Sequence, residues 1–93
     1  MSVLGKYIKQ PAETESYTID YSDDLTDGDG IVELAVTVSD PSITIVSTNH
    51  DLLSARVWLS GGAVGVKYKV EVTATTGDGR VLQDAFFVTI KDY

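Results

Sequence analysis

The 93-residue chain contains no cysteine, two prolines, one histidine and one tryptophan, and no long apolar run. Without cysteine it has neither disulfide bonds nor thiolate metal sites, which is compatible with assembly in a reducing cytoplasm. The opening residues, MSVLGKYIKQ, lack the apolar segment of a signal peptide. We therefore expect neither a signal peptide nor a membrane anchor.

Basic side chains are half as numerous as acidic ones: seven against fourteen, which gives a formal net charge of −7. Nucleic acids and anionic membranes both attract clustered positive charge, so the composition argues against either as a partner. The charge favours solubility and is compatible with a basic partner. A hydrophobic content of 43% in 93 residues suffices for one small core but not for two domains.

Apolar and polar residues alternate along several short segments, and no segment has a convincing helical period. A two-residue period is typical of strands with one buried face. Together with an N-terminal segment, the chain offers about seven strands, six of which are residues 17–22, 31–39, 42–48, 55–60, 66–76 and 81–93. The pattern predicts an all-β, immunoglobulin-like antiparallel sandwich.

The inward-facing positions of these strands predict the core. Its leading members are Tyr17, Tyr21, Val36, Tyr68, Val70, Phe86 and Val88, and Val32, Leu34 and Val38 are placed on the inner face with Val36. Residues 49–54 are predicted to form a turn, and Asp78-Gly79 a two-residue hairpin.

The first sixteen residues are interpreted as an N-terminal arm or edge strand that precedes one domain at residues 17–93. They are too few to form a core of their own. We expect residues 1 to about 10 to be mobile or to pack on a neighbouring molecule, as arms of assembly proteins do.

The run WLSGGAVGVKY places the only tryptophan, Trp58, beside three glycines. In immunoglobulin-like sandwiches a tyrosine near the start of the penultimate strand folds back to bond the backbone upstream. Gly65 and Tyr68 fit that corner, and Gly61 and Gly62 would let the chain cross between sheets. Trp58 is out of phase with its inward-facing neighbours, so core packing and contact with a partner both stay open.

Several of these stretches resemble a family of small virion proteins of tailed phages, described as fiber-tail adaptors or tail-associated proteins. The matching positions are Lys9 and Pro11, Tyr17 to Leu25, Val57 to Gly62, Gly65 to Tyr68, and Gly79-Arg80. Asp24 departs from the pattern, because the family often has an aromatic residue there. The resemblance implies a structural protein of the virion, assembled in the host cytoplasm, with other virion or tail proteins as partners and copies of itself in a ring as a further arrangement.

No set of reactive side chains in the sequence has the spacing of a known type of active site. His50 lies in a polar segment beside Asp51, and Ser60 lacks the Gly-x-Ser-x-Gly spacing of an exposed nucleophile. The acidic run DDLTDGDG fails the calcium-loop template, because counting from Asp27 puts Ile31 at position five. We therefore predict no catalytic residue, no metal site and no cofactor or small-molecule substrate.

The sequence supports two hypotheses about function. The first is a non-enzymatic tail adaptor that acts through protein contacts in an oligomeric assembly, with Tyr7, Ile8, Arg56 and Trp58 as contact residues and strand addition at a free edge as a mechanism. The alternative is a carbohydrate- or cell-surface-binding module that stacks sugars on Trp58, Phe87 and Tyr93. Coplanar aromatic rings beside carboxylates or amides would distinguish the second.

Overall fold

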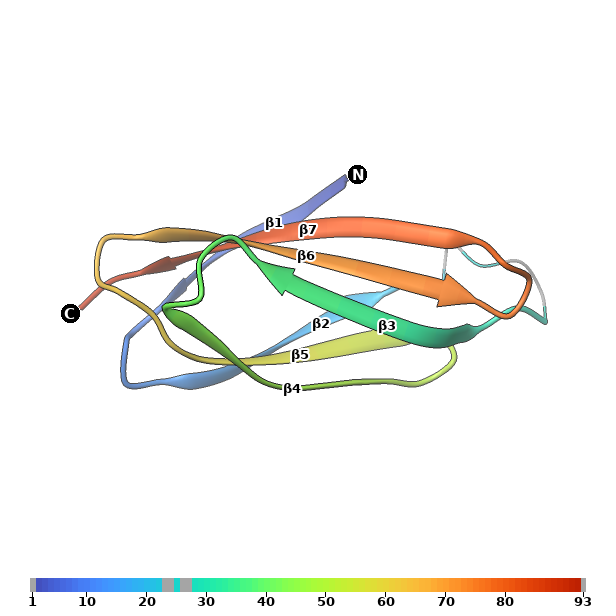
Figure 1. Cartoon of the computed structure of the whole chain (residues 1–93), viewed down its shortest axis with the longest axis horizontal. Helices are drawn as coiled ribbons and strands as arrows, with labels where there is room; N and C mark the ends of the chain where they lie inside the picture. Colours follow the sequence, from blue (N-terminus) through green and yellow to red (C-terminus); the bar gives the residue numbers. More distant parts are fainter. Residues whose placement is uncertain (1, 23–24, 26–27, 93) are drawn as a thin grey trace.

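Two β-sheets packed face to face form the molecule, which is a computed structural model that describes residues 2–22, 25 and 28–92 (Figure 1). The strands are β1 (Ser2–Lys9), β2 (Thr14–Asp20), β3 (Ile31–Val38), β4 (Ile43–His50), β5 (Ser54–Gly61), β6 (Lys67–Thr76) and β7 (Val81–Ile90). The four-stranded sheet has the order β1-β7-β6-β3 and the three-stranded sheet the order β2-β5-β4. The prediction of an all-β, immunoglobulin-like sandwich of about seven strands is confirmed.

The core lies between the two sheets and is built by the alternation seen in the sequence. In β6 every second residue from Tyr68 to Thr76 is buried, while the residues between them are exposed or half-buried. The buried apolar residues include Tyr17, Tyr21, Val57, Leu59, Tyr68, Val70, Phe86 and Val88, and Val36 packs against them partly buried. Burial of these side chains is the main stabilising contribution, about 25 cal/mol for each Å² of apolar surface removed from water.

The N-terminal segment is part of the domain. β1 pairs with β7 of the same chain, from Ser2 opposite Asp84 to Lys9 opposite Ile90. Of the two interpretations of this segment, the edge strand is the one observed, since β1 is the first strand of its sheet. The expectation that residues 1 to about 10 are mobile or pack on a neighbouring molecule is therefore wrong for residues 2–9. The boundary predicted at residue 17 falls inside β2, which begins at Thr14.

The β1–β7 pair is parallel, so the prediction of a wholly antiparallel sandwich is wrong for this pair. The physical reason is the turn at Pro11-Ala12, which carries the chain from β1 into β2 of the other sheet. β1 is thereby left beside the last strand instead of its sequence neighbour. The remaining ladders, β2–β5, β3–β6, β4–β5 and β6–β7, are antiparallel.

Three local predictions need correction. Val32 is 59% exposed, because the register of β3 shifts between Ile31 and Glu33 and turns this side chain outward. The turn predicted at residues 49–54 is shorter, since β4 continues to His50. The β6–β7 hairpin forms where expected, but Gly79 has a φ of +87° and Asp78 has no positive φ, so the loop is wider than a two-residue turn.

Candidate functional site

The glycines and the tyrosine of WLSGGAVGVKY form the joint between the two sheets. Gly61, Gly62 and Gly65 have φ angles of +73°, +104° and +84°, a region that other residues rarely adopt. The chain leaves β5 in the three-stranded sheet and enters β6 in the four-stranded sheet across them. The Tyr68 hydroxyl accepts a hydrogen bond from the Ala63 amide at 2.8 Å and is hydrogen-bonded to the Ser42 hydroxyl.

Gly62 also has no room for a side chain. A Cβ added there would lie 2.6 Å from Cγ1 and 2.8 Å from Cδ1 of Ile90. The neighbouring Gly61 carbonyl accepts a hydrogen bond from the Lys9 ammonium at 2.8 Å, and the same ammonium donates to the Gln10 carbonyl. The joint is thus tied to the end of β1 as well as to β6.

Trp58 and Arg56 lie on the outer face of the three-stranded sheet. Trp58 is half-buried on the central strand β5, between Ser16 of β2 and Ser47 of β4. Its small hydroxyl neighbours leave the indole as the largest side chain of this face. The outward positions are Thr14, Ser16, Thr18, Asp20, Thr44, Ser47, Asn49, Ser54, Arg56, Trp58 and Ser60. We call this surface the tryptophan face.

Tyr7 and Ile8 lie on β1 beside an open groove of about 440 Å³ between the edges of the two sheets. The ring of Tyr7 packs on Tyr17 and Phe86, with centroids 5.0 and 5.8 Å away. Ile8 points outward and is 56% exposed. The groove is lined by Tyr7, Ile8, Glu13, Glu15, Ser16, Tyr17 and Thr18.

Two groups around this groove have displaced pKa values. Burial raises the pKa of Tyr17 to about 12, with smaller contributions from the charges of Glu15 and Glu13. Burial lowers the pKa of Lys9, which lies almost wholly inside, and the same two glutamates partly oppose that shift. The charges of Glu13 and Glu15 therefore favour a neutral phenol at Tyr17 and a charged amine at Lys9.

The structure brings three of the four expected contact residues, Tyr7, Arg56 and Trp58, to neighbouring positions. The Ile8 side chain instead points to the outer face of the four-stranded sheet, on the same side as its partner Thr89. Thr18 of β2 lines the groove that holds Tyr7 and Ile8, and its hydroxyl accepts a hydrogen bond from Nε of Arg56 at 3.4 Å. Ser16, another lining residue, is paired with Trp58. One strand, β2, thus separates the groove from the tryptophan face.

His50 lies next to Asp51 and Ser54 in the turn between β4 and β5, yet their hydrogen bonds hold that turn together. The Ser54 hydroxyl donates to Oδ1 of Asp51 at 3.1 Å, whereas Nδ1 of His50 lies 3.1 Å from the Asp51 carbonyl. Hydrogen bonds from the Leu53 and Ser54 amides lower the pKa of Asp51. The serine is thus bonded to a carboxylate whose basicity these bonds lower, and not to the histidine.

Asp29 belongs to the acidic run DDLTDGDG, which was considered as a calcium loop. Its carboxylate instead holds two loops together. Its Oδ1 accepts hydrogen bonds from the Gly30 and Asp78 amides, which join the loop before β3 to the β6–β7 hairpin. Burial opposes ionisation, but these bonds, Thr76 and the charge of Arg80 outweigh it and lower the pKa of Asp29. Among the described residues no group of three acidic or histidine side chains could hold a metal ion; Asp23, Asp24 and Asp27 lie outside them.

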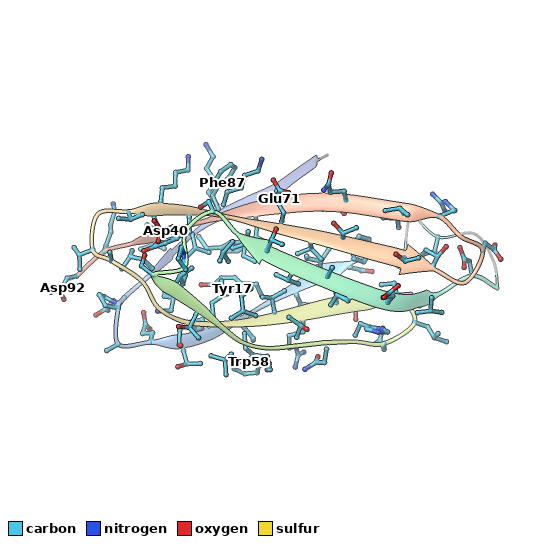
Figure 2. All side chains as sticks on the ribbon, viewed as in Figure 1. Tyr17, Asp40, Trp58, Glu71, Phe87 and Asp92 are labelled. Atoms are coloured by element: carbon cyan, nitrogen blue, oxygen red, sulfur yellow. The ribbon has the colours of Figure 1, made fainter. Side chains whose placement is uncertain are left out.

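The aromatic residues named for sugar stacking do not meet. Trp58 is on the outer face of the three-stranded sheet, and Phe87 is on the outer face of the four-stranded sheet, on opposite sides of the molecule (Figure 2). Tyr93 lies outside the described residues. The coplanar pair that the carbohydrate hypothesis required of Trp58 and Phe87 is therefore absent.

Sequence reasoning missed two features. Lys9 is buried at 1% exposure, although nothing in the sequence distinguishes it from the other lysines except Pro11 two residues later. Lys6 and Lys69 are both paired with Phe87 across the four-stranded sheet. The alternation in residues 66–76 did place Lys69 on the outer face, but it contains no information about which strands become neighbours.

Fold and site together define a β-sandwich module whose outer surface carries aromatic and charged side chains. A family model described as "Podophage GP4 fiber-tail adaptor protein gp77" matches residues 9–89, which is most of the chain. The chain belongs to this phage tail adaptor family, and the resemblance found in the sequence is confirmed. Within the curated proteins no sequence match was found.

Among solved structures, the fold is similar to part of a 2,6-sialyltransferase of Photobacterium sp. JT-ISH-224, whose crystal structure is a ternary complex with the donor product CMP and the acceptor substrate lactose. The TM-score is 0.59 and the sequence identity 9%, over 97% of this chain and 17% of that chain. At this identity the likeness concerns the fold alone. No helix in the described ranges has the length and apolar character needed to cross a membrane.

Proposed function

We propose that the chain is a non-enzymatic adaptor of the phage tail, a component of the virion that binds other tail proteins in an oligomeric assembly. The observation that carries the proposal is the surface formed by Tyr7 in the groove and by Arg56 and Trp58 on the tryptophan face. Membership of the tail adaptor family supports the same role.

The chemistry of this surface fits protein contact. Tryptophan, tyrosine and arginine are the residues most often found at the energetic centres of protein interfaces. The cross-strand neighbours of Trp58 are Ser16 and Ser47, so a partner surface can reach the indole from either side of β5 without displacing a large group there. The free edge of β2 runs between Tyr7 and Trp58 and could in addition accept a partner strand.

The test is incorporation into particles made by the phage or prophage that encodes the chain. Trp58→Ser and Tyr7→Ser should each reduce the amount of the chain in purified virions at least tenfold, as expected when a central contact worth about 1.4 kcal/mol or more is removed. Val81→Ser is the matched control, because Val81 is 63% exposed and lies away from this surface.

Wild-type levels of both variants in the virion would contradict the assigned surface, and absence of the wild-type chain from purified particles would contradict the function itself. Sedimentation of the purified chain tests self-assembly separately: a concentration-dependent oligomer lost in Trp58→Ser is the expected result.

A further inference from the structure

Three of the seven basic side chains of this acidic protein surround one aromatic ring. Phe87 of β7 is paired with Lys6 of β1 on one side and with Lys69 of β6 on the other. Residues paired directly across neighbouring strands point to the same side of a sheet, so the two lysines flank the ring. Lys67 lies over it, with its ammonium 4.5 Å from the ring centroid.

A second row of side chains extends this surface. Thr89 is paired with Ile8 of β1 and with Lys67 of β6. Phe86 and Val88, which alternate with Phe87 and Thr89, are buried, so both rows face outward. We call the surface formed by Lys6, Ile8, Lys67, Lys69, Phe87 and Thr89 the lysine face; Figure 2 places Phe87 on the side of the molecule opposite Trp58.

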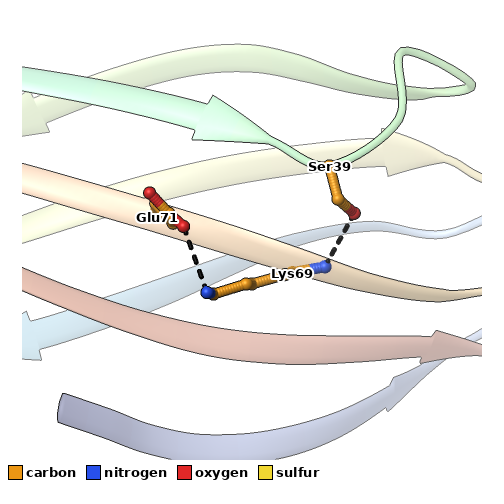
Figure 3. A network of polar contacts seen from close by, with 3 residues as sticks. All are labelled: Ser39, Lys69 and Glu71. Carbon is orange, nitrogen blue, oxygen red and sulfur yellow. Dashed lines mark hydrogen bonds and ion pairs between the residues drawn. The ribbon is translucent and has the colours of Figure 1, made fainter. Parts of the chain in front are cut away.

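In the part of the chain that the structure describes, one of the three lysines is paired with an acid of the same sheet, and the other two are not. Lys69 forms an ion pair with Glu71 at 3.1 Å, but both side chains are about one-third exposed, and exposed pairs contribute little (Figure 3). The backbone amide of Lys69 donates to the Ser39 hydroxyl, which fixes the strand and leaves the ammonium at the surface. Within the described residues no ion pair joins Lys6 or Lys67 to an acid. A local positive charge therefore stands on a chain of net charge −7.

We propose that the lysine face docks an extended acidic segment of a partner tail protein, with carboxylates on the three lysines and an apolar side chain on Phe87 and Ile8. Charge complementarity selects an acidic partner, while the half-buried ring and the exposed isoleucine favour an apolar group beside the carboxylates. β1 is an edge of its sheet, so a partner strand added there would run beside Lys6 and Ile8.

A protein segment suits this surface better than a nucleic acid does. Polyanion binding needs many phosphate contacts, whereas three lysines offer few and the net charge of −7 repels a long polyanion. A short acidic segment meets the local charge and little of the remainder, because charges beyond about 8–10 Å are screened at physiological salt.

The experiment uses the full chain, labelled with ¹⁵N, and a short synthetic peptide of alternating glutamate and threonine around a central phenylalanine. Addition of the peptide should shift the backbone amides of Lys6, Lys67, Lys69, Phe87 and Thr89 and leave the Trp58 indole signal in place. Peptides with glutamine or lysine in place of glutamate should not shift them, and added salt should weaken binding.

The variant with Lys67→Gln and Lys69→Gln should bind the peptide about tenfold more weakly, since two exposed charge pairs are lost. The matched control carries Thr44→Glu and Asn49→Glu on β4, which changes the net charge by the same amount on the tryptophan face. The control should bind as the wild type does, and melting curves verify that both variants fold.

Four outcomes overturn the inference: no amide shifts, equal binding of the glutamine peptide, equal loss of binding in the control, or tighter binding of oligo-dT on the same amides. Salt-sensitive self-association that the lysine variant loses would instead make a second copy the occupant. The inference rests on the proposed function. Incorporation of Trp58→Ser and Tyr7→Ser into virions tests that function on a different surface, so either can fail without the other.

Discussion

The tryptophan face carries serines and threonines around one indole, whereas the lysine face carries three lysines around one phenyl ring. Both lie on outward positions of strands whose inward positions fill one core. The difference shows that burial constrains every second residue and leaves the others free to take the chemistry of different contacts. A two-sheet sandwich can thus present two unlike surfaces on opposite sides of one core.

Deletion of residues 1–9 should have the largest effect. It removes β1, and with it the edge of the lysine face, the Tyr7 packing and the two hydrogen bonds of Lys9, while every strand of the tryptophan face is kept. We expect a loss of about 3–5 kcal/mol in the free energy of unfolding, similar to the removal of a large core side chain. Thermal melting should show a fall of more than about 12 °C. An unchanged melting temperature would mean that β1 is dispensable and that the lysine face is not part of a rigid surface.

Gly62→Ala should follow, since it disturbs the joint that sets one face opposite the other. The φ of +104° and the 2.6 Å approach to Ile90 Cγ1 both oppose a methyl group. We expect a loss of about 2–4 kcal/mol in urea denaturation. Gly65→Ala is the matched control, with a φ of +84° but nothing within 4 Å of the added Cβ, and should cost about 1–2 kcal/mol. Equal losses in the two variants would show that the contact with Ile90 contributes nothing.

Tyr68→Phe tests the same joint by a smaller change. The hydroxyl accepts a hydrogen bond from the Ala63 amide and is bonded to the Ser42 hydroxyl, so its removal breaks both of these bonds. The expected loss is about 1–2 kcal/mol in the free energy of unfolding. Tyr7→Phe serves as control on the half-exposed groove side and should change stability by less than about 0.5 kcal/mol. An unchanged denaturation midpoint for Tyr68→Phe would exclude the hydroxyl as a stabilising contact.

Alkaline pH should produce the smallest effect and probes the groove that lies between the faces. The folded pKa of Tyr17 is about 12, above the ordinary value of 10.0, so the unfolded chain loses this proton first. The raised pKa of Tyr17 therefore contributes to the free energy of unfolding in full below pH 10, and this contribution is lost as pH rises toward 12. Because water reaches the groove, we expect a decrease on the order of 1 kcal/mol between pH 9.5 and 11.5.

Tyr17→Phe is the reference that isolates this term from Lys9, whose lowered pKa makes stability rise with pH just below 10.5. Denaturation of the two proteins across the same pH range should therefore diverge, with the wild type falling relative to the variant. Parallel curves would mean that the groove is open enough to hydrate the Tyr17 phenolate.

Most of the core could be predicted, because buried and exposed positions of a strand alternate along the sequence. Tyr68 alternates with Val70 and Phe86 with Val88, and each pair lies where the two-residue period placed it. The alternation failed at Val32, which it placed inward although the side chain is exposed. The register shift responsible depends on how β3 pairs with β6. β1 was misjudged for a related reason: a strand that completes its pairing at the far end of the chain carries no local sign of its partner.

The candidate site was likewise predictable in part: the outward position of Trp58 could be read from the sequence, but its neighbours from other strands could not. Trp58 was recognisable as out of phase with Val57 and Leu59, and its exposure on the outer face of β5 agrees with that. Its proximity to the groove of Tyr7 was not predictable, since it depends on β2 lying between β1 and β5. The lysine face was missed altogether, although each of its residues had been placed in a strand or in the N-terminal segment.

The sequence by itself determined most of the buried apolar positions, the approximate places of the turns and that Gly62 and Tyr68 make a corner, because solvation and backbone sterics act on each residue locally. Tertiary structure alone decided which outward residues meet. Lys6, Lys69 and Phe87 are separated by tens of residues in the chain, and they become neighbours only when β1 adds in parallel to β7 and β6 pairs on its other side. The order of the strands depends on how the whole chain covers its core and pairs its strands. No single segment of the sequence contains that information.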